Sequence, residues 1–185
     1  MDDKIRCSWC GSDTLYQNYH DTEWGRPVYD DRLLFEFLIL EGFQAGLSWI
    51  TILKRREGFR SAFDNFDYTI IANYGQQKIN QLITDDRIIK NKLKINAAVT
   101  NAKAFMEVQK EFGSFSKYIW SFTNGEPIVN YPKVHADIPA QTSLSVAISK
   151  DLKKRGFKFV GPTIMYAFMQ AVGIVDDHIS DCWVK

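Results

Sequence analysis

The chain has 185 residues, with 23 Lys and Arg against 22 Asp and Glu, and 45% of its residues are hydrophobic. This near-neutral charge neither requires nor excludes a nucleic acid partner, because a local basic face is enough to bind one. No apolar run reaches the roughly eighteen residues of a membrane-spanning helix, and the opening MDDKIRCSWC has no apolar segment typical of a secretion signal. We therefore expect one domain over residues 1–185, with its own core and no membrane partner.

Hydrophobic periodicity and helix-end signals predict helices along almost the whole chain. Asp30 and Asp31 are expected to cap a helix that ends near Gly42, and Ser48 is expected to cap the next, which ends near Gly58. Further helices are expected over residues 69–73, 76–84, 88–112, 114–124, 143–155 and 162–173, with the main loop over residues 126–143. Strand signals are weak, so the predicted fold class is all-α.

The stretch EGFQAGLSWI begins at Glu41 and directly follows the apolar run LLFEFLIL. A carboxylate in such a buried helix costs several kcal/mol of desolvation unless another group pairs with it. No Lys or Arg lies within eight residues of Glu41 on either side. Glu41 is therefore predicted to pair with a residue distant in the sequence, or to bind a ligand.

Five aromatic residues cluster in sequence near this carboxylate: Trp9, Tyr16, Tyr19, Trp24 and Trp49. Aromatic faces with one carboxylate suit a flat ring that donates hydrogen bonds, because stacking contributes about 1–3 kcal/mol per base. A positive charge on that ring would add to the attraction. The same residues could also pack in a core, and composition alone does not separate the two interpretations.

Three cysteines make an odd count, which favours a cytosolic metal site over disulfides. His178 and Cys182 in DHISDC are spaced to share one face of a helical turn, and this pair suits tetrahedral Zn²⁺. The N-terminal ligands stay ambiguous, since Cys7 can be joined by His20 or by Cys10. Either set fills all four positions, so the zinc would be structural and would join the two ends of the chain. The alternative is free buried cysteines with surface histidines.

Five stretches resemble the 3-methyladenine DNA glycosylase I family of bacterial alkylation-repair enzymes: RCSWC, YHDTEWG, LEGFQAGLSWITILKRRE, RGFKFVGPTIMYAFMQAVG and DHISDC. They extend from Arg6 to Cys182. The resemblance implies an all-α fold of the helix-hairpin-helix DNA glycosylase type, with one structural zinc ion joining the N- and C-terminal segments. It also implies a bacterial cytoplasmic enzyme that acts on double-stranded alkylated DNA and releases free 3-methyladenine. We expect a monomer, because the chain is predicted to form one compact domain.

The resemblance assigns roles to residues by position. Glu41 would be the catalytic residue and would contact the excised base together with Tyr19. Trp49 would stack on the base, and the pocket would be completed by Trp9, Tyr16 and Trp24. Gly46 and Leu47 would enter the gap left in the duplex. The zinc ligands would be Cys7, His20, His178 and Cys182, without Cys10.

Two features depart from related hairpin glycosylases. No Asp occurs between Asp86 and Asp137, so the aspartate expected beyond the hairpin is missing, which predicts poor activity on neutral lesions. Arg87 stands where the family is expected to have a hairpin glycine, a residue that lets the backbone approach a phosphate closely. Two alternatives are a zinc-joined helical DNA-binding module without catalysis, and a glycosylase with another base preference.

Overall fold

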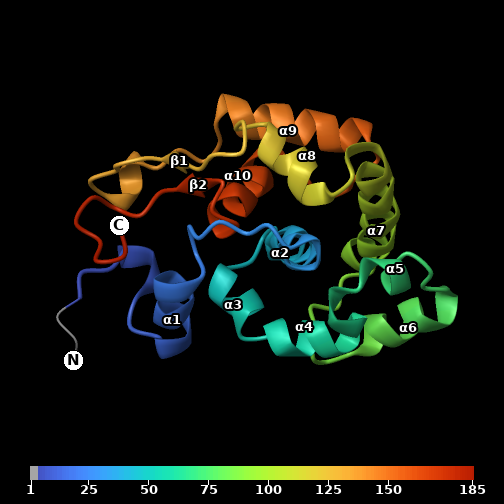
Figure 1. Cartoon of the computed structure of the whole chain (residues 1–185). Helices are drawn as coiled ribbons and strands as arrows, with labels where there is room; N and C mark the ends of the chain where they lie inside the picture. Colours follow the sequence, from blue (N-terminus) through green and yellow to red (C-terminus); the bar gives the residue numbers. More distant parts are fainter. Residues whose placement is uncertain (1–3) are drawn as a thin grey trace.

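The computed structural model describes residues 4–185. The α-helices are α1 (Thr14–Thr22), α2 (Asp31–Gln44), α3 (Trp49–Leu53), α4 (Arg56–Ala62), α5 (Tyr68–Ile71), α6 (Gln76–Thr84), α7 (Lys92–Phe112), α8 (Phe115–Ser121), α9 (Ser143–Lys154) and α10 (Pro162–Ala171). Short 3₁₀ helices are η1 (Ser8–Cys10), η2 (Asp64–Phe66) and η3 (His135–Asp137), and the strands β1 (Ile128–Val129) and β2 (Val175–Asp176) pair in parallel. The predicted all-α class is confirmed (Figure 1). Among residues 4–185, no helix combines the length and apolar character needed to span a membrane.

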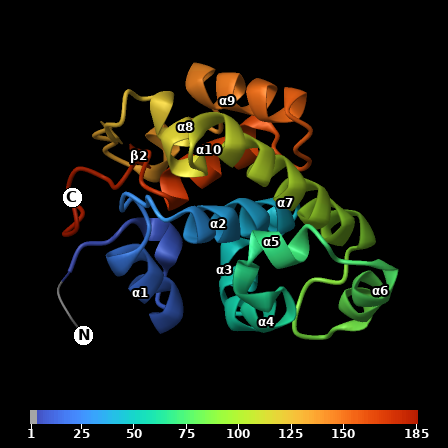
Figure 2. The ribbon, with the colours of Figure 1, turned by 45° about the vertical axis from the view of Figure 1, so that its right-hand side comes forward.

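Helix α2 lies at the centre of the molecule and packs against α3, α7, α8 and α10 (Figure 2). Every residue from Leu34 to Phe43 is buried, as expected for a helix that is apolar on all sides. Two of these residues, Glu36 and Glu41, are acidic. Glu36 pairs with Arg56 and Arg60. The central helix therefore buries two carboxylates. Glu36 has cationic partners, whereas the group that pairs with Glu41 has to be found in the site around it.

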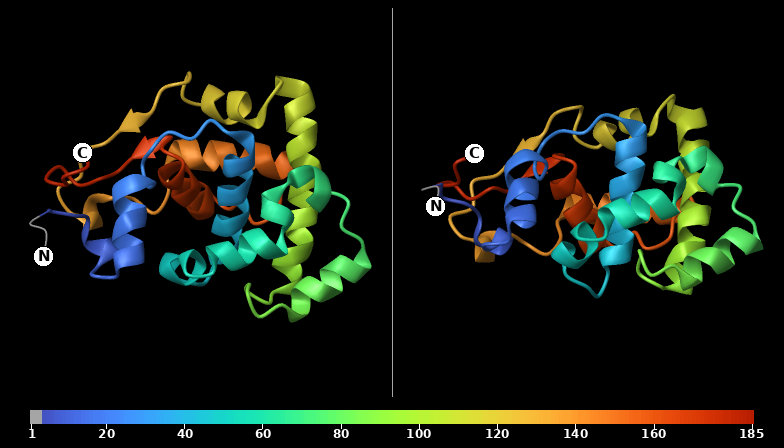
Figure 3. Two further views of the ribbon diagram at one scale, coloured as in Figure 1. Left: turned by 60° about the horizontal axis from the view of Figure 1, so that its bottom comes forward. Right: turned by 90° about the horizontal axis from the view of Figure 1, so that it is seen from below.

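The helices before α7 and those after it lie on different sides of α2, and α7 connects the two groups (Figure 1). The two ends of the described chain meet away from α7, where the Trp183 N–H donates to the Ile5 carbonyl at 2.9 Å. The views of Figure 3 show the C-terminal segment beside η1 and α1. The N-terminal segment, which carries most of the candidate pocket residues, is therefore held by the last residues of the chain.

Several predicted helix starts are confirmed by their hydrogen bonds. Asp30 accepts from Leu33 N–H at the start of α2, and Thr142 accepts from Ser145 N–H at the start of α9. Pro162 is the first residue of α10. Ser48 precedes α3 as expected, but its hydroxyl bonds to the Thr51 hydroxyl instead of to the backbone.

Two predicted boundaries were wrong. Gly58 does not end a helix. The helix that begins after Ser48 ends at Leu53, and a second helix, α4, begins at Arg56 and continues through Gly58. A Cβ atom at Gly58 would lie 2.5 Å from the Arg87 carbonyl oxygen, so this glycine permits close helix–loop contact. The long helix α7 begins at Lys92 and not near residue 88, because Asn91 accepts two backbone N–H groups as its N-cap.

Candidate functional site

A cavity of about 240 Å³ lies beside the last turns of α2. Its walls contain all six residues that the sequence assigned to base binding: Trp9, Tyr16, Tyr19, Trp24, Glu41 and Trp49. They come from η1, α1, the segment after α1, α2 and the start of α3. The structure thus brings together residues from separate elements, although their roles remain predictions.

Glu41 is the acidic residue of this cavity. Its side chain is 3% exposed, and its Oε2 atom has no hydrogen-bond partner within the protein. Among residues 4–185, no Lys, Arg or His forms an ion pair with it. Burial alone raises the pKa of Glu41 to about 8. The carboxylate is therefore costly to ionise until a cationic or hydrogen-donating ligand contacts it.

Two indole groups in the same cavity also lack partners. Trp9 Nε1 and Trp49 Nε1 are buried, and neither donates a hydrogen bond within the protein. Buried polar groups in proteins are almost always paired. Two unused donors and one unused acceptor in one cavity indicate that a polar ligand completes the site.

The aromatic side chains form a packed enclosure. The Tyr19 and Trp49 ring centroids lie 5.5 Å apart with 45° between their planes, and Phe37 stacks behind Trp49. Trp9 meets Trp24 edge-on at 4.9 Å. Burial is the main reason that the pKa of Tyr19 lies well above 10, so its phenol stays protonated and can donate at neutral pH.

Four further residues line the cavity that sequence reasoning did not identify: Gln44, His135, Ala167 and Gln170. Gln44 could have been found, since it follows Glu41 by one helical turn and shares its face of α2. Gln170 donates to Asp177 Oδ2 at 2.7 Å. His135 belongs to η3 inside the predicted loop, and no sequence signal places that loop over the cavity.

The candidate DNA-inserting residues lie directly beside the cavity. Gly46 has φ +84°, a conformation that favours glycine, and Leu47 is 41% exposed. A groove containing Glu41, Gln44 and Leu47 connects the two features. Gly42, the other glycine of EGFQAGLSWI, lies inside α2 against Phe159 and takes no part in this turn.

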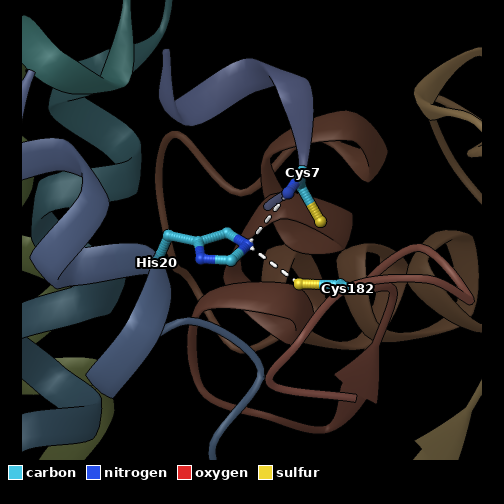
Figure 4. A group of neighbouring side chains, drawn as sticks. All are labelled: Cys7, His20 and Cys182. Atoms are coloured by element: carbon cyan, nitrogen blue, oxygen red, sulfur yellow. Dashed lines mark hydrogen bonds between the residues drawn. The ribbon is translucent and has the colours of Figure 1, made fainter. Parts of the chain in front are cut away.

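Three candidate zinc ligands converge between the chain ends (Figure 4). The ligand atoms of Cys7, His20 and Cys182 all lie within 4.8 Å of one another, and all three residues are buried. Cys10 is not in this group, and its thiol donates to the Cys7 carbonyl at 3.1 Å. Two thiols and an imidazole are a donor set that suits zinc.

His178 lies next to this group without belonging to it. Its ring centroid is 4.9 Å from that of His20, and its buried Nε2 has no partner within the protein. The prediction that His178 and Cys182 share a helical turn was wrong, because residues 177–179 have no helical structure. Asp21 bonds His20 Nδ1 and Asp176 bonds His178 Nδ1, each at 2.8 Å. Carboxylates commonly orient metal-binding imidazoles in this way, so the residues present fit a zinc ion.

The described lining of the cavity contains no second carboxylate that could replace the aspartate expected beyond the hairpin. Glu41 is the one acidic residue among the described residues that line it. Arg87, at the expected hairpin, is already bonded to both Asp85 oxygens and to the Ser61 hydroxyl. The missing aspartate therefore has no evident replacement within residues 4–185, and the helix-hairpin-helix assignment stays a prediction.

Several known proteins resemble this chain in sequence and in structure. The model of the methyladenine glycosylase family matches residues 9–185. The DNA-3-methyladenine glycosylase of Haemophilus influenzae is 49% identical over 180 residues, covering 97% of each chain. A crystal structure of 3-methyladenine DNA glycosylase I has a TM-score of 0.94 and 47% identity, covering 97% of this chain and 98% of that one. A variant of 3-methyladenine DNA glycosylase I in complex with 3-methyladenine has a TM-score of 0.94 and 38% identity, covering 97% of both chains.

An all-α enclosure of aromatic residues around one unpaired carboxylate, with this degree of similarity, defines a DNA glycosylase. More particularly, the chain belongs to the methyladenine glycosylase family. It is therefore an enzyme, which argues against the alternative of a DNA-binding module without catalysis.

Proposed function

We propose that this chain flips 3-methyladenine out of alkylated double-stranded DNA and hydrolyses its N-glycosidic bond, with Glu41 recognising the base. The observation that carries the proposal is the buried, unpaired Glu41 Oε2 among aromatic rings. The unused N–H groups of Trp9 and Trp49 support a ligand with hydrogen-bond acceptors as well as donors. Flipping costs a few kcal/mol, and less for a damaged base.

The positive charge of the lesion explains why the base cavity contains a buried carboxylate. The exocyclic amine of 3-methyladenine donates hydrogen bonds, and the methylated ring is cationic while it is joined to the sugar. A cation in contact with Glu41 favours the ionised carboxylate and so opposes the burial that raises its pKa to about 8. Entry of the cationic nucleotide and loss of the Glu41 proton to solvent therefore favour each other.

Bond cleavage then needs little further help from the protein. The N-glycosidic bond breaks with its electron pair moving to the base, which departs as neutral 3-methyladenine. Water adds to the sugar carbon and releases a proton to solvent. Glu41 is the one carboxylate among the described lining residues, so catalysis rests on binding that favours the expelled base and on desolvation.

The loop beyond α2 suits the gap that flipping leaves in the duplex. Leu47 is exposed at its tip, and Gly46 gives the backbone the left-handed turn that projects it. The groove beside Leu47 opens toward Glu41. In the proposed complex Leu47 fills the vacated position in the stack while the flipped base occupies the aromatic cavity.

The proposed zinc ion has a structural role. Cys7, His20, His178 and Cys182 would hold it, and it would supply a fixed link between the chain ends without taking part in the reaction. The convergence of Cys7, His20 and Cys182 supports this role, as does the unpaired Nε2 of His178. Trp24 lies 4.6 Å from the His178 ring and also lines the base cavity. The link would therefore stabilise one wall of the pocket.

Identification of the released base tests the proposal. Methylated duplex DNA is incubated with the protein, and the bases in the supernatant are identified by chromatography. We expect 3-methyladenine from the wild type and from Glu57→Gln, which changes an exposed carboxylate of α4. Release of a different base would favour the alternative base preference. Binding of the duplex without release of any base would contradict the proposed reaction.

A further inference from the structure

Lys94 is a buried cation that the proposed reaction does not use. It lies in the first turn of α7 and is 8% exposed. Among residues 4–185, no carboxylate pairs with its ammonium group. Burial lowers the pKa of Lys94, so its position is costly unless its hydrogen bonds compensate.

The ammonium group instead bonds to the end of the central helix. Lys94 Nζ donates to the Phe43 carbonyl at 2.8 Å and to the Ala45 carbonyl at 2.7 Å. These carbonyls belong to the last turn and the C-cap of α2, where backbone acceptors lack helical partners and carry partial negative charge. Lys94 thus caps α2 from about 50 residues away in the sequence.

The capped segment is the wall between the base cavity and the exposed loop. Phe43 and Ala45 flank Gln44, which lines both the cavity and the adjoining groove. The chain then turns at Gly46 and presents Leu47. Lys94 reaches this wall from α7, which packs against α2 (Figure 2). It lines a small pocket that shares no residue with the base cavity.

The geometry points to Lys94 as a positioning residue that fixes the Leu47 loop relative to Glu41, so that insertion into the duplex and capture of the base occur in register. This inference rests on the proposed insertion of Leu47. Free base needs only the cavity, whereas a flipped nucleotide needs the cavity and the loop at a fixed separation. Loss of the ammonium group should therefore impair action on DNA far more than binding of free base.

The first test is Lys94→Met, which keeps the length of the side chain and removes the donors. Single-turnover release of 3-methyladenine from duplex DNA should fall about 10- to 100-fold, as expected for a misplacement near 1 Å, while the affinity for free 3-methyladenine changes little. Val108→Ala, on the same helix and 1% exposed, is the control for general loss of stability. Equal losses in both variants, or an equal loss of free-base affinity, would overturn the inference.

A double-mutant comparison identifies the loop as the target. If Lys94 acts through Leu47, adding Lys94→Met to Leu47→Ala should cost almost nothing further, whereas independent roles would give additive losses and overturn the inference. Should Lys94→Met fail to fold, Lys94→Gln removes the charge and shortens the side chain by one atom while keeping an N–H donor. Its loss should be smaller than that expected for Lys94→Met and should again add almost nothing to Leu47→Ala, and an additive loss would overturn the inference.

An optical signal keeps this test separate from the proposed reaction. A 2-aminopurine placed beside an abasic analogue reports insertion of Leu47 without any cleavage. We expect Lys94→Met to lower this signal toward that of Leu47→Ala, and an unchanged signal would overturn the inference. If the wild type inserts but releases no base, the proposed reaction fails while the insertion signal still decides the role of Lys94.

Discussion

His20 Nε2 lies 3.4 Å from Cys182 Sγ, although 162 residues separate the two in the sequence. Cys7 joins them, while the Cys10 thiol bonds to a backbone carbonyl instead. This contact makes the choice between the two zinc-ligand sets testable, because the sets differ only in His20 and Cys10.

Cys10→Ser should retain one equivalent of zinc and nearly native thermal stability, whereas His20→Ala should lose the zinc. Structural zinc binding contributes about 10 kcal/mol or more in small peptides, but this chain has a large core of its own. We therefore expect His20→Ala to be weakened and not unfolded, with a damaged base pocket. Elemental analysis and thermal melting check both variants. Zinc that is lost from Cys10→Ser and kept in His20→Ala would reverse the assignment.

The cavity offers Glu41 and no second acidic residue among the described lining residues, which predicts a narrow choice of lesion. A positioned general acid or base contributes roughly 10²–10⁴-fold, so neutral lesions that need one should react at least about 100-fold more slowly than 3-methyladenine. Single-turnover release of hypoxanthine, uracil and 3-methyladenine from matched duplexes gives the comparison. Similar rates would mean that another catalytic carboxylate operates.

Glu41 should also make the stability of the free protein depend on pH. Its pKa rises from 4.5 to about 8 on folding, so between these values the folded state holds a proton that the unfolded chain has lost. The free energy of unfolding should therefore fall as pH rises through this window, by up to a few kcal/mol. Glu41→Gln removes this dependence, so its stability advantage over the wild type should grow from pH 5 to pH 8.5.

Urea denaturation at the two pH values measures this difference. Glu107→Gln is the matched control, because the Glu107 side chain is 70% exposed. Its stability difference from the wild type should be nearly the same at both pH values. If the stability difference between Glu41→Gln and the wild type is also the same at both pH values, Glu41 is ionised in the free protein.

The sequence predicted the local features of this fold well. The acidic cap at Asp30, the proline at the start of α10 and the apolar run of α2 are all properties of neighbouring residues, and each was confirmed. The unusual burial of Glu41 was also evident, because it follows from an apolar run without a nearby cation.

Features that depend on distant contacts were not predictable in the same way. Gly58 resembled a helix stop, but it marks the close approach of Arg87. The two carbonyls capped by Lys94 and the cavity wall formed by His135 likewise depend on how separate segments meet. The spacing of His178 and Cys182 suggested a helical turn, which a non-helical segment replaces.

The central claim is that Glu41 recognises the base, and the affinity of free 3-methyladenine for the wild type and for Glu41→Gln tests it most directly. The amide keeps the size of the side chain but turns part of an acceptor into a donor that faces the amine of the base. Hydrogen bonds to charged groups contribute about 1.5–3 kcal/mol, so calorimetric titration should show binding weakened by roughly 10- to 100-fold, with Glu107→Gln unchanged. If Glu41→Gln binds the free base as tightly as the wild type, Glu41 is not the residue that recognises 3-methyladenine.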